Sequence, residues 1–268
     1  MDNRPIGVFD SGLGGLTAVK ELESALPGES IVYFGDNGRV PYGTRSRETV
    51  RGYARQDMAF LMGQGVKAVL AACGTVSSVA ADIGAELPVP YFDVLSPTAQ
   101  AAQAATRNGK IGVIGTSATI ASGSYERALK GIDPSLEIYP QACPLFVPLV
   151  ENGFVSPEDP VTRLVVERYL VPLKEQGVDT LILGCTHYPI LRQTIAQVMS
   201  DSVTLIDSGR EAALALATEL KDWDLLADTA QTRKVDYFVT DNPEGFRGVA
   251  ELFLGHSVEG ELHRVTIE

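Results

Sequence analysis

Short apolar runs alternate along this chain with longer segments in which apolar residues recur every three or four positions. The first two runs are residues 6–9 and 31–34, and an apolar stripe from Leu16 to Leu26 lies between them. Uninterrupted apolar runs of this length are typical of strands buried on both faces of a parallel sheet, and the stripe is typical of a helix packed on that sheet. The pattern therefore predicts an α/β fold.

The same alternation continues through the rest of the chain. Further strands are expected at residues 66–72, 89–94, 111–114 and 181–183. Further helices are expected at residues 46–62, in an Ala/Gln-rich segment after Pro97, around residues 120–129, from Pro157 to about Gln176, and from Pro189. Proline in a first helical turn breaks no hydrogen bond, so Pro189 marks a helix start. After residues 206–209 the pattern returns to helix and strand, and this tail could complete either half of the molecule.

Two halves of the chain resemble each other. Residues 7–12 are similar to residues 112–117, and each half then carries a cysteine directly after a later strand, Cys73 in the first and Cys185 in the second. One interpretation is a duplicated unit, which predicts two pseudo-symmetric α/β lobes with mainly parallel sheets and a cleft between them. The other is that any two strand–helix units look alike at this level of detail.

The two matching cysteines are the main candidates for chemistry. Ligands of open α/β sheets bind outside the carboxyl ends of the strands, where both thiols are expected. Two thiols presented to one cleft from opposite sides can pass a proton across a carbon atom. The alternative is a pair of structural thiols, the commoner role of a buried cysteine.

Two features favour the catalytic interpretation. A helix N-terminus, expected after each cysteine, lowers the pKa of a thiol. The neighbours Thr75, Thr186 and His187 are polar, which a buried apolar site would not need. His187, two residues after a candidate thiol, is a candidate general acid/base rather than a structural histidine.

Composition and charge narrow the function classes. The chain has 268 residues, 45% hydrophobic and 21% charged, as in an ordinary globular protein. Its net charge of −12 argues against a nucleic-acid binder, whose surface would be basic. No apolar stretch is long enough to span a bilayer, and residues 1–5 lack a signal peptide's hydrophobic region, so we expect no membrane partner and a cytoplasmic location. Three cysteines are a poor disulfide framework, and Cys143 is expected to be a small buried apolar residue.

Cofactor and metal sites fit the sequence poorly. The turn at residues 12–15 is close to a dinucleotide-binding fingerprint, but Thr17 stands where a third glycine is needed and Asp10 would repel a pyrophosphate. A zinc site built from both cysteines, His187 and Asp10 lacks CxxC or comparable ligand spacing. A redox disulfide needs the two sulfurs at bonding distance, which sequence alone does not establish. We therefore expect no cofactor and no metal.

Six short motifs lie at the expected strand ends and turns. They are Asp10-Ser11-Gly12, Pro41-Tyr42-Gly43, Cys73-Gly74-Thr75, Gly115-Thr116 with Thr119, Glu151-Asn152-Gly153 and Gly184-Cys185-Thr186-His187-Tyr188-Pro189. In this order, over about residues 6–209, they resemble the motifs of the glutamate racemase family, part of the cofactor-independent aspartate/glutamate racemase superfamily. The segments around Tyr42 and Cys185 are highly specific for this family.

The resemblance implies two α/β lobes with the active site in the cleft between them. Residues 1–96 plus 208–268 would form the first lobe, and residues 97–207 the second. It also implies cofactor-independent interconversion of L- and D-glutamate by two cysteine bases, an amino-acid racemase (isomerase) activity. This activity would supply D-glutamate for bacterial peptidoglycan, and so for cell-wall biogenesis and cell shape. A homodimer is compatible with the family.

The resemblance also assigns roles to individual residues. By motif match, the acid/base pair would be Cys73 and Cys185, assisted by Asp10, Glu151 and His187. The substrate's carboxylates and ammonium group would be held by Asp10, Ser11, Tyr42, Gly43, Gly74, Thr75, Thr116, Thr119, Thr186 and His187. Backbone N–H groups at these turns are candidate donors to the carboxylate of the developing carbanion.

Gly74 departs from the family pattern. The residue after the first catalytic cysteine is usually asparagine, whose side chain would contact the amino acid. We expect a water molecule to fill the gap and Gly74→Asn to improve glutamate binding, unless glycine is needed there for a positive φ. Two alternatives follow from Gly74: a superfamily racemase for a related amino acid such as aspartate, and a non-catalytic binding protein of the same fold. The intact cysteine pair argues against the second.

Overall fold

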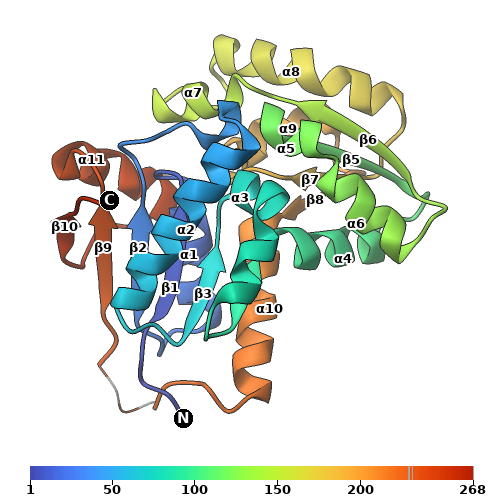
Figure 1. Cartoon of the computed structure of the whole chain (residues 1–268). Helices are drawn as coiled ribbons and strands as arrows, with labels where there is room; N and C mark the ends of the chain where they lie inside the picture. Colours follow the sequence, from blue (N-terminus) through green and yellow to red (C-terminus); the bar gives the residue numbers. More distant parts are fainter. Residues whose placement is uncertain (229, 231, 268) are drawn as a thin grey trace.

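Two parallel β-sheets form the centre of the computed structural model, which describes residues 1–228, 230 and 232–267 (Figure 1). The larger sheet contains, from edge to edge, β10 (Leu262–Arg264), β9 (Val235–Val239), β2 (Ile31–Gly35), β1 (Ile6–Asp10), β3 (Ala68–Ala71) and β4 (Tyr91–Asp93). The smaller sheet contains β6 (Glu137–Ala142), β5 (Lys110–Gly115), β7 (Thr180–Leu183) and β8 (Thr204–Asp207). We call the parts of the chain around these sheets lobe 1 and lobe 2.

The two lobes share one strand order. The series β2-β1-β3-β4 of lobe 1 corresponds to β6-β5-β7-β8 of lobe 2, and the strands in both pair in parallel. In each lobe the first strand lies between the second and the third. Ligands of open parallel sheets bind at the strand ends beside such a reversal of strand order. The predicted α/β class with two mainly parallel sheets is confirmed, and the shared order supports the pseudo-symmetry.

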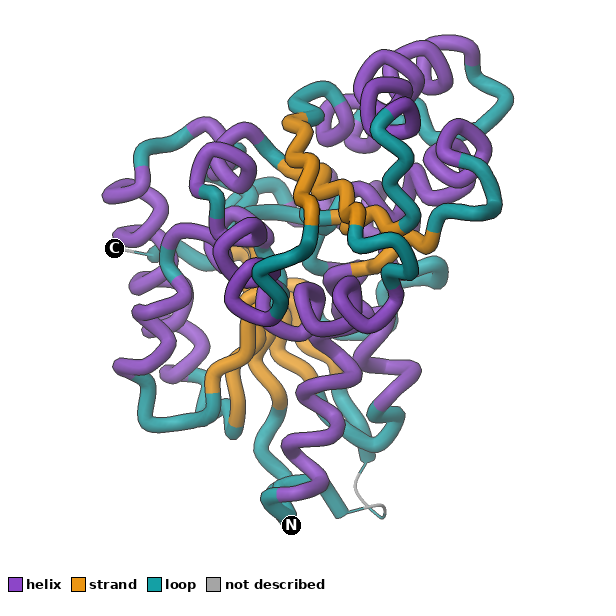
Figure 2. The backbone as a smooth tube through the Cα atoms, turned by 90° about the vertical axis from the view of Figure 1, so that its right-hand side faces the viewer, coloured by secondary structure: helices purple, strands orange, loops and turns teal. Residues whose placement is uncertain are grey.

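Helices surround both sheets (Figure 2). The helices of lobe 1 are α1 (Leu16–Ala25), α2 (Arg47–Gly63), α3 (Gly74–Val79) and α11 (Pro243–Leu254), with 3-10 turns η1 (Tyr42–Thr44) and η2 (Ala81–Glu86). The helices of lobe 2 are α4 (Leu95–Ala105), α5 (Ser117–Ser122), α6 (Ser124–Ile132), α7 (Phe146–Glu151), α8 (Pro160–Glu175) and α9 (Arg192–Met199), with the 3-10 turn η3 (Tyr188–Leu191). The remaining helix, α10 (Ser208–Asp222), packs against both α1 and α4.

A shared apolar core joins the lobes. Leu22 of α1, Leu183 of β7 and Leu216 of α10 belong to the same cluster of buried residues. The start of α10 lies close to α1, because a Cβ on Gly209 would be 3.3 Å from the Cα of Ala18. Apolar surface from both lobes is therefore buried in one interior, which holds the lobes together.

Most of the predicted elements are present, with three differences. The helix expected around residues 120–129 is two helices, because Gly123 has a φ of 63° and ends α5 before α6 begins. The helix expected from Pro189 begins as the 3-10 turn η3, and α9 follows it. Strands β6 and β8 and helix α7 were not predicted. Pro140 lies within β6 and argues against a strand, but it is tolerated because β6 is an edge strand.

The boundaries of the lobes stay a proposal. The strands of the larger sheet come from residues 6–93 and 235–264, and those of the smaller sheet from residues 110–207. We propose the division into residues 1–96 plus 208–268 and residues 97–207 on this basis. Helix α4 begins at Leu95, just before the proposed boundary, and α10 contacts elements on both sides of the other boundary.

Candidate active site

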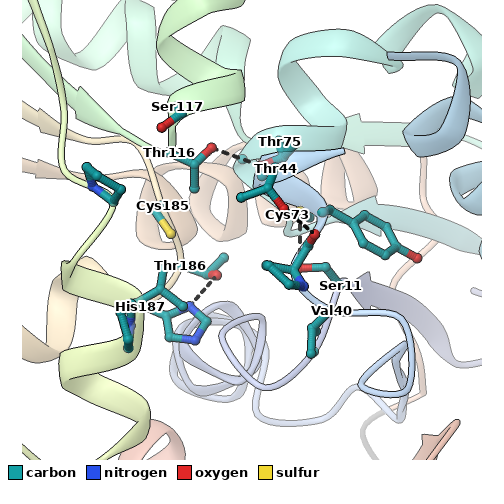
Figure 3. Close-up of a pocket in the computed structure, with 18 of the residues that line it drawn as sticks. Ser11, Val40, Thr44, Cys73, Thr75, Thr116, Ser117, Cys185, Thr186 and His187 are labelled. Atoms are coloured by element: carbon teal, nitrogen blue, oxygen red, sulfur yellow. Dashed lines mark hydrogen bonds between the residues drawn. The ribbon is translucent and has the colours of Figure 1, made fainter. Parts of the chain in front are cut away.

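A cavity of about 320 Å³ lies between the lobes, at the carboxyl ends of their central strands (Figure 3). Segments that follow β1, β2 and β3 line its lobe 1 side, and segments that follow β5, β6 and β7 line its lobe 2 side. The predicted site residues that line it are Ser11, Tyr42, Gly43, Cys73, Gly74, Thr75, Thr116, Glu151, Cys185, Thr186 and His187. The predicted residues Asp10 and Thr119 are buried behind this lining, at 1% exposure each.

Cys73 and Cys185 reach this cavity from opposite lobes. Figure 3 shows Cys73 with Ser11 on one side of the pocket, and Cys185 with His187 on the other. Cys73 is 4% exposed and Cys185 is 8% exposed, so both thiols are largely shielded from solvent. A small molecule held in the cavity therefore has one thiol from each lobe beside it.

Cys73 is the N-cap residue of α3 and has a buried thiol. Its Sγ donates a hydrogen bond to Ser11 Oγ at 3.7 Å. Burial, and secondly the nearby carboxylate of Asp10, raise the pKa of Cys73 to about 12, although the N–H of Val76 in α3 acts in the opposite direction. The helix N-terminus thus lowers the pKa of Cys73 as expected, but its effect is smaller than that of burial. Removal from water disfavours the thiolate more than one helix N–H group favours it.

Asp10 lies at the end of β1, and the following turn folds back onto it. Its Oδ2 accepts a hydrogen bond from the N–H of Gly12 at 2.9 Å. A Cβ on Gly15 would lie 2.5 Å from the Asp10 Cβ, so glycine permits this close turn. Burial raises the pKa of Asp10, and the positive charge of His187 and the N–H groups of the turn offset part of that effect. The arrangement places a carboxylate with increased proton affinity near Cys73.

His187 connects Cys185 to Glu151. Its Nε2 lies 3.0 Å from Oε1 of Glu151 at the end of α7, and its Nδ1 lies 3.5 Å from Oγ1 of Thr186. The ring packs edge-on against Phe253 of α11, with centroids 5.1 Å apart. Burial alone would lower the pKa of His187, but its hydrogen bonds with Cys185 and Glu151 outweigh burial and raise the pKa to about 10. His187 therefore carries a proton at neutral pH and can exchange it with Cys185.

Threonine hydroxyls link the two lobes beside the cavity. Thr75 Oγ1 of lobe 1 and Thr116 Oγ1 of lobe 2 are 3.1 Å apart. Thr116 is the N-cap residue of α5, where its Oγ1 accepts from the N–H of Thr119 at 3.2 Å and donates to the Thr119 hydroxyl at 3.0 Å. In a second contact, Thr17 Oγ1 of lobe 1 donates to the Thr186 carbonyl oxygen at 3.1 Å. Together these bonds bring the lobes together at two places.

The hydroxyl of Tyr42 bonds within lobe 1. It donates to the carboxylate of Asp36 and lies 3.0 Å from Oδ2 of Asp57, and the side chains of both aspartates are fully buried. Arg39 pairs with both carboxylates, at 2.5 Å from Asp36 and 3.1 Å from Asp57. Burial and these carboxylates raise the pKa of Tyr42. A contact of Tyr42 or Gly43 with a substrate would therefore come from their main chain, and the backbone N–H of Gly43 is among the donors expected from the sequence.

Gly74 lines the cavity and lies close to the backbone of lobe 2. A Cβ on Gly74 would lie 2.5 Å from the carbonyl oxygen of Gly184 and 3.8 Å from the Cα of Cys185. Gly74 also lies outside the glycines with positive φ. A positive φ is therefore not the reason for glycine at this position, and improved glutamate binding by Gly74→Asn stays a prediction. The backbone of lobe 2 occupies the space in which that side chain would begin.

Sequence reasoning missed one wall of the cavity. Cys143 is buried as expected, but it lines the cavity, and its Sγ donates to the carbonyl of Gln141 at 3.7 Å. Pro144, Val147 and Pro148 add apolar surface beside it. These residues follow β6, the strand that the sequence pattern did not reveal. Recognition of that strand would have placed them at the same sheet edge as the cysteines.

Two further interpretations can be tested against the geometry. The turn at residues 12–15, which resembled a dinucleotide fingerprint, is packed against lobe 2, because a Cβ on Gly14 would lie 2.1 Å from Thr186 Oγ1 and 2.5 Å from His187 Nδ1. This turn has no room for a pyrophosphate. In the part of the chain that the structure describes, no group of three or more His, Cys, Asp or Glu side chains could hold a metal ion.

Comparison with known proteins identifies a family and full-length relatives. A family model described as Asp/Glu/Hydantoin racemase matches residues 6–216. The glutamate racemase of Geobacter metallireducens is 45% identical over 266 residues, which cover 99% of this chain and 97% of that protein.

Solved structures agree with this relationship. The glutamate racemase of Francisella tularensis, in a complex with D-glutamate, has a TM-score of 0.92 and 42% identity, with 99% of this chain and 98% of that chain covered. The aspartate racemase of Picrophilus torridus has a TM-score of 0.58 and 19% identity, with 83% and 99% covered. The second likeness is one of fold alone.

Proposed function

The chain belongs to the Asp/Glu/Hydantoin racemase family and is an amino-acid racemase, and we propose that it interconverts L- and D-glutamate without a cofactor, with two cysteines as bases. The observation that carries the proposal is one cavity lined by Cys73 from lobe 1 and Cys185 from lobe 2. Its near-full-length relatives, which share about 45% identity, are glutamate racemases, which favours glutamate over aspartate as the substrate.

The reaction breaks and re-forms one Cα–H bond. The α-proton of an amino acid is very weakly acidic, and pyridoxal phosphate is the usual sink for the resulting electrons. In the two-base reaction, a thiolate on one face takes the proton and becomes a thiol. The thiol on the other face gives its proton to the opposite side of the carbon and becomes a thiolate. No electrons leave the substrate, so orientation and hydrogen bonds to its carboxylate have to stabilise the carbanion.

Each cysteine has a different partner for its proton. Asp10, with its raised pKa, would exchange a proton with Cys73. His187, held by Glu151, would exchange a proton with Cys185. Because these partners lie behind the thiols, each cysteine can be returned to its starting protonation state between turnovers.

Hydroxyl and main-chain groups around the cavity would hold the substrate. We assign this role to Ser11, Gly43, Gly74, Thr75, Thr116 and Thr186, which line the cavity, and to the main chain of Tyr42. Thr119 would act indirectly, since it is buried behind Thr116 and shares a hydrogen bond with it. The apolar wall at residues 143–148 would limit water around the reacting carbon.

The cellular role that fits this activity is the supply of D-glutamate for peptidoglycan, and so for cell-wall biogenesis and cell shape, in the cytoplasm. Among the helices that the structure describes, none is long and apolar enough to cross a membrane. A homodimer stays an expectation from the family.

Circular dichroism of the purified protein in heavy water tests the proposal. With L-glutamate and no added cofactor, we expect the signal to decay to zero, and with L-aspartate we expect it to persist. Each thiol carries one proton, which exchanges with solvent before the next turnover. New D-glutamate should therefore carry deuterium at Cα while the remaining L-glutamate stays largely unlabelled at early times. Rapid labelling of unreacted substrate would show a single base and contradict the mechanism.

Serine variants test the two thiols separately. Cys73→Ser and Cys185→Ser should each lower turnover on the order of 10²–10⁴-fold, because a serine hydroxyl is far too weak an acid to replace the thiol. Cys143→Ser is the matched substitution in the same cavity, at a thiol to which we assign no proton transfer, and it should have a much smaller effect. Wild-type turnover in either of the first two variants would return that cysteine to a structural role.

A further inference from the structure

Two buried aspartates meet at one tyrosine hydroxyl behind the η1 wall of the cavity. The hydroxyl of Tyr42 is hydrogen-bonded to Asp36 and lies 3.0 Å from Oδ2 of Asp57. Both aspartate side chains are 0% exposed. The guanidinium of Arg39 pairs with both, at 2.5 Å from Asp36 and 3.1 Å from Asp57. Two ionised carboxylates on this one guanidinium would leave one negative charge unbalanced, which is costly away from water.

The oxygens around Tyr42 need one more hydrogen than its hydroxyl supplies. A hydroxyl has one hydrogen to donate, and an ionised carboxylate has none. Tyr42 lies within hydrogen-bonding distance of two carboxyl groups, so it cannot bond to both if both are ionised. One of them has to be protonated and to donate to the Tyr42 oxygen.

The partners of the two carboxyl groups place this hydrogen on Asp57. Both oxygens of Asp36 already accept from other donors, since Arg39 Nε donates to Oδ2 and the Thr240 hydroxyl donates to Oδ1 at 2.9 Å. Oδ1 of Asp57 accepts from Arg39, and among the described residues its Oδ2 hydrogen-bonds only with the Tyr42 hydroxyl. Oδ2 of Asp57 therefore carries the proton and donates to Tyr42, which in turn donates to Asp36.

We infer that Asp57 is a neutral carboxylic acid in the folded protein and that it positions η1 as a wall of the cavity. Tyr42 and Gly43 of this turn line the cavity, and the inference rests on the proposed function, in which their main chain holds the substrate. A neutral Asp57 adds a hydrogen bond behind the wall without a negative charge that would repel the substrate's carboxylates. Asp57 is thus a positioning residue.

The electrostatic surroundings of Asp57 agree with this assignment. Burial first, and then the carboxylate of Asp36, raise the pKa of Asp57 well above its usual range, and Asp10 acts in the same direction. Arg39 and the hydroxyl of Tyr42 act in the opposite direction. These groups face Asp57 from β1, from the segment after β2 and from η1. Where two carboxyl groups share one site, the pKa of one is strongly raised and it keeps its proton.

Infrared spectroscopy detects this proton directly. A protonated carboxyl group has a C=O stretching band that an ionised carboxylate lacks. At neutral pH, the difference spectrum between the unsubstituted protein and Asp57→Asn should contain that band. Asp82→Asn is the matched control, because Asp82 also pairs with an arginine, Arg51, but its side chain is 64% exposed. Its difference spectrum should contain the bands of a carboxylate instead.

The pH dependence of stability gives a second readout. The amide of Asp57→Asn still donates to Tyr42 but takes up no proton on folding. Because the pKa of Asp57 is raised in the folded protein, its contribution to stability is complete below the unfolded value of about 3.9 and is lost as the pH rises. The urea midpoint of Asp57→Asn should therefore exceed that of the unsubstituted protein at about pH 8, and the difference should narrow toward about pH 5. Asp82→Asn should change the midpoint little.

Asp57→Leu tests the positioning role, since leucine makes no hydrogen bond to Tyr42 or Arg39. A misplaced donor costs binding in the ground and transition states alike. We expect KM for both glutamate enantiomers to rise about 10- to 100-fold, the factor for a lost hydrogen bond to a charged group, with kcat nearly unchanged. Asp57→Asn should restore the KM of the unsubstituted protein. A variant that only unfolds more readily would lower the active fraction and leave KM unchanged.

The outcomes separate the inference from the proposed function. Absence of the infrared band, or a lower urea midpoint of Asp57→Asn at about pH 8, would show that Asp57 is ionised and overturn the inference. An unchanged KM in folded Asp57→Leu would overturn its positioning role. If Asp57→Leu does not fold, the KM of Asp57→Asn decides that role, because a raised KM contradicts it. If the unsubstituted protein does not racemise glutamate, the proposed function fails, and the infrared and urea measurements still decide whether Asp57 holds a proton.

Discussion

The two cysteines of the cavity have unlike surroundings. Cys73 has a buried carboxylate nearby, and burial raises its pKa to about 12, so its thiol keeps its proton at neutral pH. Cys185 shares a hydrogen bond with His187, whose pKa is raised to about 10. The lobe 1 side can therefore donate a proton from the thiol itself, whereas on the lobe 2 side the imidazolium holds one.

The pKa of His187 predicts the pH above which activity falls. Its pKa of about 10 lies above the ordinary histidine value of about 6.5, so the imidazolium persists through neutral pH and is lost as the pH rises through about 10. We expect kcat/KM to fall above pH 10, and His187→Asn to remove that fall while lowering the rate. The proton on His187 stabilises the folded state fully below about pH 6.5, and this stabilisation is lost as the pH rises through the pKa of His187 in the folded protein.

His256→Asn is the control for this pH profile. His256 also pairs with a carboxylate, since its Nε2 lies 2.7 Å from Oε2 of Glu23, but it lies outside the cavity. Its replacement should leave the alkaline limb in place. An alkaline limb near pH 10 that survives in His187→Asn would assign the limb to another group.

Sequence motifs located the cysteines and threonines of the cavity, but not the direction of every side chain. The positions could be predicted because the ends of parallel strands converge at one sheet edge. The hydroxyl of Tyr42 could not, because Asp36 and Asp57, which bind it, carry no local signal of proximity. The pKa values of the cavity residues could not be predicted from the sequence either. The pKa of Cys73 depends on its burial by other segments, which a local pattern does not contain.

Among the structural elements, the 3-10 turn η1 forms a wall of the cavity and is held from behind. Arg39, just before it, pairs with the buried carboxylates of Asp36 and Asp57 and lies over the ring of Tyr53, 4.1 Å from its centroid. Thr240, after β9, donates to Oδ1 of Asp36 at 2.9 Å. The wall is thereby tied to α2 and to the C-terminal part of the chain.

Tyr42→Phe should weaken this support. Loss of its hydroxyl leaves the two buried carboxylates without one donor, and an unsatisfied buried group costs about 1–3 kcal/mol. We expect a decrease of that size in the free energy of unfolding, measured with urea. Tyr139→Phe is the matched control, because Tyr139 donates to Oε2 of Glu137 at 2.8 Å on an exposed strand. An equal effect of both substitutions would show that burial of the Tyr42 network has no special importance.

The elements most clearly predicted were the fully buried strands. In β1, β3 and β7 every residue is buried, so their apolar runs are uninterrupted. Edge strand β6 is partly exposed and contains Pro140, and its sequence lacks such a run. The break at Gly123 between α5 and α6 was also missed, because glycine within a helical pattern can either continue the helix or end it.

Over the whole molecule, a buried ion pair holds the segment that returns from lobe 2 to lobe 1. Lys67 Nζ lies 2.6 Å from Oε2 of Glu29, and their side chains are 0% and 3% exposed. The Lys67 ammonium also donates to the carbonyls of Asp2 and Leu225, each at 2.7 Å. Oε1 of Glu29 accepts from the N–H of Ala227 at 2.7 Å. One lysine thus joins the N-terminal segment to the chain that follows α10.

Lys67→Met should destabilise the molecule strongly. It leaves the Glu29 carboxylate buried without its partner, and removal of one member of a buried pair costs about 3–5 kcal/mol. Urea denaturation should show a decrease of that size in the free energy of unfolding. Arg55→Met removes an exposed pair with Glu86, whose atoms are 3.3 Å apart, and should change the midpoint little. Comparable midpoints for the two variants would mean that the buried pair adds no more than a surface pair.

The two lobes share a strand order, and the two enantiomers proposed as substrates share one free energy. L- and D-glutamate are mirror images with equal free energies in water, so the equilibrium constant between them is unity. A racemase must therefore have equal kcat/KM in the two directions, however unlike its two bases are. The different partners of Cys73 and Cys185 can make kcat differ between the enantiomers only if KM differs in the same ratio. Two similar lobes with dissimilar side chains thus act on two substrates that differ in handedness but have the same free energy in water.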